Sequence, residues 1–142
     1  MYDSGTYFLD ANVLMYAAGS DHPLREPCQQ ALTRAVDEDI GLVTNAEVLQ
    51  EILYRYFSIG RPESARTVHR SAIDLCDEVF PVEVMHTTAA LELLIEYPQL
   101  TPRDAIHVAT MQLRGLELLL STDQDFDGLS DIERVDPATF LL

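Results

Sequence analysis

Short apolar, β-prone runs alternate with longer amphipathic stretches along the chain, and this alternation limits the fold more than any other feature. The runs with the length and composition of strands are residues 6–9, 40–43, 78–82, 116–120 and 132–135. The stretches with the i, i+3, i+4 apolar spacing typical of helices are residues 13–18, 24–37, 48–56, 62–75, 87–97 and 101–114. Strands without polar alternation favour a parallel sheet covered on both faces. We therefore predict an α/β fold, a three-layer α/β/α sandwich with a mainly parallel central sheet.

The size of the chain favours a single domain that comprises residues 1–142. If the 142 residues were divided into two domains, each would be too small for a good core. No apolar run approaches the roughly 20 residues needed to cross a bilayer. The first residues, Met1–Gly5, lack the basic segment of a secretory signal, so we expect a cytoplasmic protein without membrane contact. Cys28 and Cys76 lack the spacing of a zinc site, and we interpret them as reduced and buried.

The charge balance excludes several classes of enzyme. The formal net charge is −15, and all nine basic residues are arginines. Walker-type NTPases and Schiff-base enzymes both need a lysine, which this sequence lacks. A strongly acidic surface also gives no support to nonspecific nucleic-acid binding. It does not exclude a nuclease that holds RNA locally through arginines and a metal ion.

Acidic residues recur where the predicted strands end. Asp10 and Asp123 follow predicted strands, Glu51 lies in the helix after the second strand, and Asp104 opens the helix before the fourth. In parallel sheets, sites form outside the carboxyl ends of the strands. We therefore expect these four side chains to converge.

Each of these residues also has a local structural interpretation. Asp10 could cap the following helix, and Asp104 could form a capping box with Thr101. Asp123 could belong to a solvated acidic turn. Glu51 could pair with Arg55 one turn later on the same helix.

A second glutamate near Glu51 has to be separated from it. The segment Thr44–Glu47 matches a capping box, which gives Glu47 a sufficient local role. Glu51 is therefore the better candidate for a metal ligand.

Several carboxylates brought together raise one another's pKa unless a cation is present. Hard divalent ions such as Mg²⁺ take oxygen ligands, and two such ions about 4 Å apart can promote phosphodiester cleavage. His107 lies one turn after Asp104 and could face the same place. A buried or supporting role for His107 is the favoured interpretation.

The order of these motifs resembles the PIN-domain family, in particular the toxin ribonucleases of VapBC-type toxin–antitoxin modules. FLDANVLMY (8–16) is similar to the opening strand with its first aspartate, and VTNAEVLQEILYRY (43–56) to the second motif. TPRDAIHVATM (101–111) is similar to the third motif and LLLSTDQDFDGL (118–129) to the fourth. The resemblance covers nearly the whole chain in order.

The resemblance implies a metal-dependent endoribonuclease that uses Mg²⁺ or Mn²⁺, the toxin of a type II toxin–antitoxin module. It implies an RNA substrate, a cognate antitoxin protein and a homodimer. The catalytic and metal-binding residues would be Asp10, Glu51, Asp104 and Asp123, with Asp125 as a further contributor. Polar neighbours would be Asn12, Asn45 and Thr122. Among the arginines, we expect Arg61, Arg66 or Arg103 to contact RNA phosphate.

Other functions fit the sequence less well. Haloacid dehalogenase-type phosphatases also begin with a strand and Asp-x-Asp, but here the second position is Asn12 and the lysine of that class is missing. The missing lysine also argues against a receiver domain. A non-catalytic PIN-like scaffold that binds RNA or protein remains the alternative, although clustered carboxylates near phosphates would not help a pure binding surface.

Overall fold

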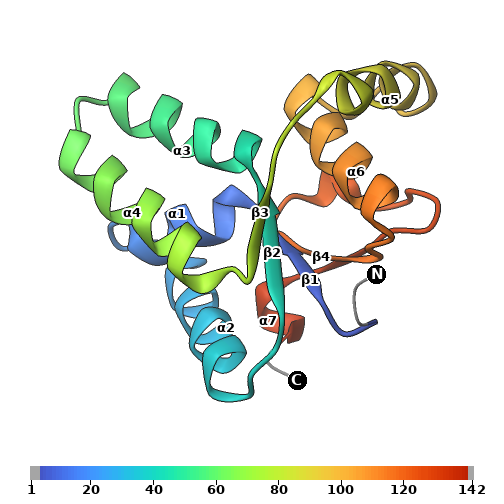
Figure 1. Cartoon of the computed structure of the whole chain (residues 1–142). Coiled ribbons are helices and arrows are strands. Elements are labelled where there is room, and N and C mark those ends of the chain that lie inside the picture. Colours follow the sequence, from blue (N-terminus) through green and yellow to red (C-terminus); the bar gives the residue numbers. More distant parts are fainter. Residues whose placement is uncertain (1–3, 141–142) are drawn as a thin grey trace.

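A computed structural model describes residues 4–140 and contains a five-stranded sheet with the order β3-β2-β1-β4-β5 (Figure 1). The strands are β1 (Tyr7–Leu9), β2 (Leu42–Asn45), β3 (Glu78–Phe80), β4 (Leu118–Leu120) and β5 (Glu133–Val135). All four strand pairings are parallel. The predicted parallel sheet is therefore confirmed.

Helices cover both faces of this sheet. They are α1 (Ala11–Ala18), α2 (Arg25–Asp37), α3 (Ala46–Ser58), α4 (Pro62–Leu75), α5 (Val84–Glu96), α6 (Pro102–Arg114) and α7 (Pro137–Phe140). Helices α1 to α4 lie on one face and α5 with α6 on the other, while α7 packs against α2 (Figure 1). This is the predicted three-layer α/β/α arrangement, and it follows from right-handed crossovers that change direction after β3.

The central strands carry the core. Phe8, Val43, Leu119 and Leu120 are fully buried between the two helical layers. Burial on both faces explains why these strands are continuous apolar runs without polar alternation. The buried central strands fix where β1 and β4 end, and therefore the positions of Asp10, which caps α1, and of Ser121, which begins the loop after β4.

Several element boundaries differ from the prediction by one to three residues, and two of them have a clear physical reason. Strand β2 begins at Leu42 and not at residue 40, because the Ile40 amide donates to the Ala35 carbonyl at the end of α2. Helix α5 begins at Val84, three residues earlier than expected. Its start is stabilised by His86, whose Nδ1 accepts from the Glu83 amide at 2.9 Å. A histidine in this capping position lacks the usual Glu or Gln signature.

The structure also adds two short elements that the sequence did not predict, a 3₁₀ turn η1 (Gln124–Phe126) and helix α7. Both cysteines are free. Cys28 is buried as predicted, but Cys76 follows α4 and is only half-buried, which corrects that prediction. Burial raises the pKa of each thiol to about 12.

Within residues 4–140, no helix has the length and apolar character needed to span a membrane. The Met1–Gly5 segment, which we expected to carry no secretory signal, lies partly outside the described residues.

Candidate active site

Four acidic residues lie around the carboxyl edge of the sheet. Asp10 directly follows β1 and Asp123 lies beyond β4, the strand that pairs with β1. Glu51 lies in the second turn of α3, which follows β2, and Asp104 is the third residue of α6. Residues far apart in the sequence are brought together because parallel strands end at the same edge.

Asp10 is the buried centre of this group, with 4% of its surface exposed. Its Oδ1 accepts from the Ala11 amide at 2.8 Å, so the capping interpretation is correct. Its Oδ2 accepts from the Ser121 hydroxyl at 2.7 Å and from the Asn12 amide group at 3.1 Å. Asp10 therefore caps α1 with one oxygen and faces a polar network with the other.

The pKa of the Asp10 carboxyl is raised from 3.8 to about 6. Burial is the largest cause, and the negative charges of Glu51 and Asp104 add to it. His107 and the Ser121 hydroxyl oppose the rise without cancelling it. A cation beside Asp10 would relieve this unfavourable ionisation.

Glu51 contacts His107, and among the described residues the alternative pairing of Glu51 with Arg55 is not formed. The Nε2 atom of His107 lies 3.1 Å from Glu51 Oε1 and 3.9 Å from Asp10 Oδ1. One ligand atom from each of these three residues falls within 4.8 Å of the others. Burial lowers the pKa of His107, but the hydrogen bond to Glu51 and the nearby carboxylates outweigh it and raise the pKa overall.

Asp104 forms the predicted capping box with Thr101. The Asp104 amide donates to Thr101 Oγ1 at 3.2 Å, and the Thr101 amide donates to Asp104 Oδ2 at 3.3 Å. The pKa of Asp104 is raised overall, mainly by burial. The bonds to Thr101 oppose this rise, and the charge of Asp123 adds to it. Asp104 therefore interacts electrostatically with Asp10 and with Asp123.

Ser121 connects Asp10 to the loop after β4. Its hydroxyl donates to Asp10 and accepts from the Asp123 amide at 3.0 Å. Asn12 extends the network, because its Oδ1 accepts from the Thr122 amide at 3.2 Å. Sequence reasoning missed Ser121, although a small hydroxyl residue directly after a buried strand was a usable signal.

These positions fit a known family. A profile described as the PIN domain matches residues 7–132. The chain belongs to the PIN-domain family. Ribonuclease VapC13 of Mycobacterium tuberculosis is 38% identical over 127 residues, which cover 89% of this chain and 97% of the relative. Ribonuclease VapC23 of Mycobacterium tuberculosis (strain CDC 1551) is 39% identical over 119 residues, which cover 82% and 91%.

Solved structures share the PIN fold. VapC20 of Mycobacterium tuberculosis, described as a sarcin-ricin loop cleaving toxin, superposes with a TM-score of 0.70 at 18% identity and covers 89% of this chain and 98% of its own. FitAcB of Neisseria gonorrhoeae gives 0.69 at 16% identity, with coverage of 92% and 97%. At these identities the likeness supports the fold alone.

The remaining predicted PIN-site residues differ in how they contact the acidic group. Asn12 contacts Asp10 directly, whereas Thr122 contributes its backbone amide to Asn12. Asp125 is exposed in η1 and donates its amide to Asp123 Oδ1 at 2.9 Å. Its role as a metal ligand stays a prediction.

Asn45 is fully buried, and its side chain bonds to residues other than the four carboxylates. Its side chain accepts from the Val48 amide at 3.0 Å and donates to Thr110 at 2.9 Å. The capping box predicted for Glu47 is therefore wrong, because Asn45 is the cap and Val48 is the third helical residue. Glu47 instead lies 3.5 Å from Arg103.

The three candidate arginines lie in different surroundings. Arg103 pairs with Glu47 and stacks over the Tyr54 ring at 4.9 Å. Arg66 pairs with Glu63 at 3.4 Å on the exposed face of α4. Arg61 lines a hollow whose lining also includes Asn12 and Arg55. Of the three, only Arg61 shares a hollow with a residue of the polar network, Asn12.

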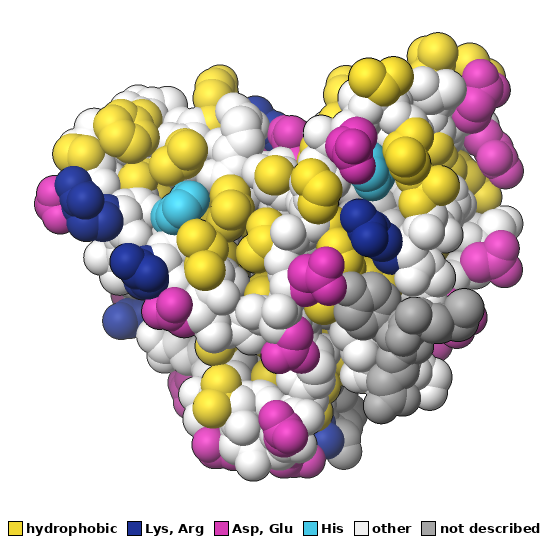
Figure 2. Space-filling model, viewed as in Figure 1, with side chains coloured by type: hydrophobic (Ala, Val, Ile, Leu, Met, Phe, Trp, Pro, Cys, Tyr) yellow, Lys and Arg dark blue, Asp and Glu magenta, His cyan; other side chains and the backbone are white. Residues whose placement is uncertain are grey.

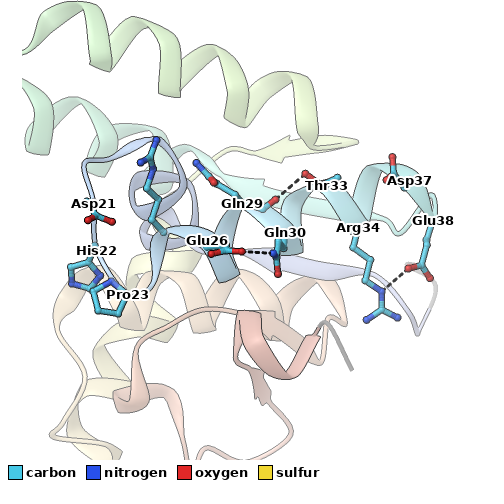
Figure 3. Close-up of a pocket in the computed structure, with 11 residues that line it drawn as sticks. Asp21, His22, Pro23, Glu26, Gln29, Gln30, Thr33, Arg34, Asp37 and Glu38 are labelled. Atoms are coloured by element: carbon cyan, nitrogen blue, oxygen red, sulfur yellow. Dashed lines mark hydrogen bonds and ion pairs between the residues drawn. The ribbon is translucent and has the colours of Figure 1, made fainter.

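Another hollow lies along α2 (Figure 3). Its polar side chains already pair with one another: Gln30 donates to Glu26 at 2.9 Å and Arg34 to Glu38 at 2.7 Å. None of the four acidic site residues lines it. We therefore place the candidate active site at the sheet edge.

The donor set of the PIN site fits a hard divalent cation. Carboxylate oxygens are the ligands that such ions prefer, and the mutual repulsion seen at Asp10 is the state that a cation relieves. The pairing of Asp10 with Glu51 supplies two such ligands within a few ångströms. The residues present are thus suited to a metal-dependent reaction.

Proposed function

We propose that this chain is a metal-dependent endoribonuclease, the toxin of a type II toxin–antitoxin module, and that residues 1–142 form one nuclease domain. The observation that carries the proposal is the close approach of Glu51 and His107 to the buried Asp10, whose pKa is raised to about 6 by burial and by the charges of Glu51 and Asp104. Relatives named as ribonucleases align with most of the chain, which supports the same activity.

Asp10, Glu51, Asp104 and Asp123 would hold Mg²⁺ or Mn²⁺, with Asp125 as a further contributor. When bound, such an ion supplies activation of a water molecule and stabilisation of charge at the phosphate. Ser121 and Asn12 orient one oxygen of Asp10, and the Thr101 amide orients one oxygen of Asp104. These bonds fix the orientation of the Asp10 and Asp104 carboxylates before substrate arrives, which lowers the reorganisation needed for reaction.

Substrate RNA would be held locally, because a net charge of −15 repels it at long range. Arg61 is the first candidate for a phosphate contact, since it lines the same hollow as Asn12. Arg66 and Arg103 would have to leave their partners Glu63 and Glu47 to do the same. A toxin acting on cellular RNA would work in the cytoplasm.

An antitoxin protein would bind the groove between α3 and α4. Apolar side chains are exposed over this part of the surface (Figure 2), and the groove includes Leu53, Phe57 and Ile73. Arg66 and Arg70 line the same groove. In an otherwise acidic protein, this combination suits a partner segment that carries apolar and acidic residues.

The test is cleavage of a fluorescent single-stranded RNA with Mg²⁺, Mn²⁺ or EDTA. We expect metal-dependent internal cleavage by the natural protein. Asp10→Asn, Glu51→Gln, Asp104→Asn and Asp123→Asn should each reduce the rate roughly 100-fold or more, as loss of a charge-stabilising group does at other active sites.

Glu47→Gln is the matched control for Glu51→Gln. Glu47 lies one turn earlier on the same helix, but its carboxylate pairs with Arg103. This control variant should keep most of the activity. Near-normal cleavage by the Asp10 or Asp123 variant would refute the proposed site. A protein that binds RNA but cleaves none with either ion would favour the scaffold alternative.

A further inference from the structure

The two ring nitrogens of His107 meet very different surroundings. Nε2 faces the acidic group, 3.1 Å from Glu51 Oε1 and 3.9 Å from Asp10 Oδ1. Nδ1 is buried and has no hydrogen-bond partner among residues 4–140. The ring is fully buried beside Phe8, with the ring centroids 5.4 Å apart. The imidazole is therefore held in place by packing, with one nitrogen directed at the site.

This position is compatible with two roles for His107. One ligand atom each from His107, Asp10 and Glu51 could surround a single ion, since the three atoms lie within 4.8 Å of one another. Alternatively, His107 could act as a hydrogen-bond donor to Glu51 and leave the metal to oxygen ligands. The two roles require the proton on different nitrogens.

The buried Nδ1 distinguishes the two roles. A ligating Nε2 must be unprotonated, which places the proton on Nδ1. Metal-bound histidines almost always donate that second N–H to a carboxylate, carbonyl or water. Among the described residues no acceptor is within reach of Nδ1, so this tautomer would bury an unpaired N–H. A proton on Nε2 instead forms a charge-assisted bond to Glu51.

We infer that His107 is a positioning residue whose Nε2–H holds Glu51 Oε1, so that the other oxygen of Glu51 is presented to the metal ion. This inference rests on the proposed metal-dependent function. It has a consequence for metal choice. A site with oxygen ligands alone accepts Mg²⁺ and Mn²⁺ alike, whereas a histidine nitrogen favours Mn²⁺ over Mg²⁺.

The experiment measures Mg²⁺ and Mn²⁺ binding to RNA-free protein by calorimetry, for the natural chain and for two variants. His107→Leu removes the donor and keeps an apolar side chain in the buried position. This variant should lower the affinity for both ions in parallel, by roughly 10–100-fold, as the loss of supporting groups does at other metal sites. His107→Gln can place an amide N–H near the position of Nε2 and should restore most of the affinity for both ions.

His86→Leu is the matched control. His86 is equally buried, but its hydrogen bond is to the Glu83 amide at the start of α5. It should change thermal stability without changing either metal affinity. An equal loss in the His86 variant would assign the effect of His107→Leu to general destabilisation and overturn the inference.

Nuclear magnetic resonance of ¹⁵N-labelled histidine with saturating Mg²⁺ tests the tautomer directly, without any variant. We expect His107 Nε2 to carry a proton. An unprotonated Nε2, or loss of Mn²⁺ binding alone in both variants, would show that His107 is a ligand. Failure of the natural protein to bind either ion would overturn the proposed function as well, whereas natural binding with an unchanged His107→Leu variant would overturn this inference alone.

Discussion

The carboxylate of Asp10 is used in two ways at one position. One oxygen caps α1 through the Ala11 amide, and the other is held by Ser121 and Asn12. Capping favours the ionised carboxylate, whereas burial near Glu51 disfavours it. Burial prevails, and the pKa of Asp10 is raised to about 6. In the absence of metal, this residue therefore opposes folding at neutral pH.

The first prediction concerns the pH dependence of stability in EDTA. Folded Asp10 keeps its proton up to a pH near 6, whereas its ordinary pKa is 3.8. The contribution of Asp10 to the free energy of unfolding is therefore fully present below pH 4. It is lost as the pH rises through 6, a change of roughly 3 kcal/mol. Asp10→Asn should remove this loss and stabilise the metal-free protein by about 1–2 kcal/mol at pH 7.5, because Ser121 and Asn12 must partly reorient. Urea unfolding from pH 4 to 8 measures it.

Asp127→Asn provides the control of opposite sign. Arg134 holds the pKa of Asp127 below its usual value through hydrogen bonds at the surface. That carboxylate stabilises the fold above its ordinary pKa, and its effect is lost as the pH falls. An Asp10 variant that is less stable than the natural protein at pH 7.5 in EDTA would contradict the first prediction.

At the scale of elements, one buried hydrogen bond links the two helices that carry site residues. Asn45 caps α3, which holds Glu51, and also donates to Thr110 of α6, the helix that holds Asp104 and His107. Thr110 in turn donates to the Ile106 carbonyl at 2.8 Å. The spacing between the two helices is therefore fixed from within the core.

The second prediction is that this link supports both stability and metal binding. Asn45→Ala should cost about 2 kcal/mol, roughly half from the lost cap and half from the lost buried bond. A double-mutant cycle with Thr110→Val, measured by urea unfolding, should give a coupling energy of about 1 kcal/mol. Purely additive effects would indicate that the two side chains act independently.

At the scale of the whole molecule, exposed apolar side chains follow one face of α5. Val84, Leu91 and Ile95 are 80%, 57% and 70% exposed and share a helical face through their spacing. Large exposed apolar side chains grouped on one helix indicate an interaction surface. We expect a second copy of this chain to bind this face of α5, which would form the predicted homodimer.

The third prediction is that charge placed on this face separates the two copies. Leu91→Glu with Ile95→Glu should convert a dimer into a folded monomer, because apolar contacts would be replaced by repelling carboxylates. Light scattering coupled to gel filtration measures the mass. Val36→Glu is the control, since Val36 is 62% exposed on α2, outside this face. A natural protein that is monomeric at about 100 μM, well above the Kd of a stable dimer, would contradict the expectation.

The sequence by itself determined the five strands and the helices α1 to α6, in their order. Apolar runs without alternation predicted buried parallel strands, and the acidic residues at their ends predicted where a site would form. The choice of Glu51 over Glu47 also came from the sequence, although the capping box invoked for Glu47 is wrong. These features are readable because periodicity and turn chemistry depend on residues close together in the chain.

Only the tertiary structure decided the contacts that shape the site. Ser121 and Asp10 are 111 positions apart, and His107 and Glu51 are 56 apart, yet both pairs form hydrogen bonds. The raised pKa of Asp10 likewise depends on burial by the whole core. Such effects arise from packing between distant segments, and no local pattern encodes whether a given histidine or serine will face a carboxylate or a neighbouring strand.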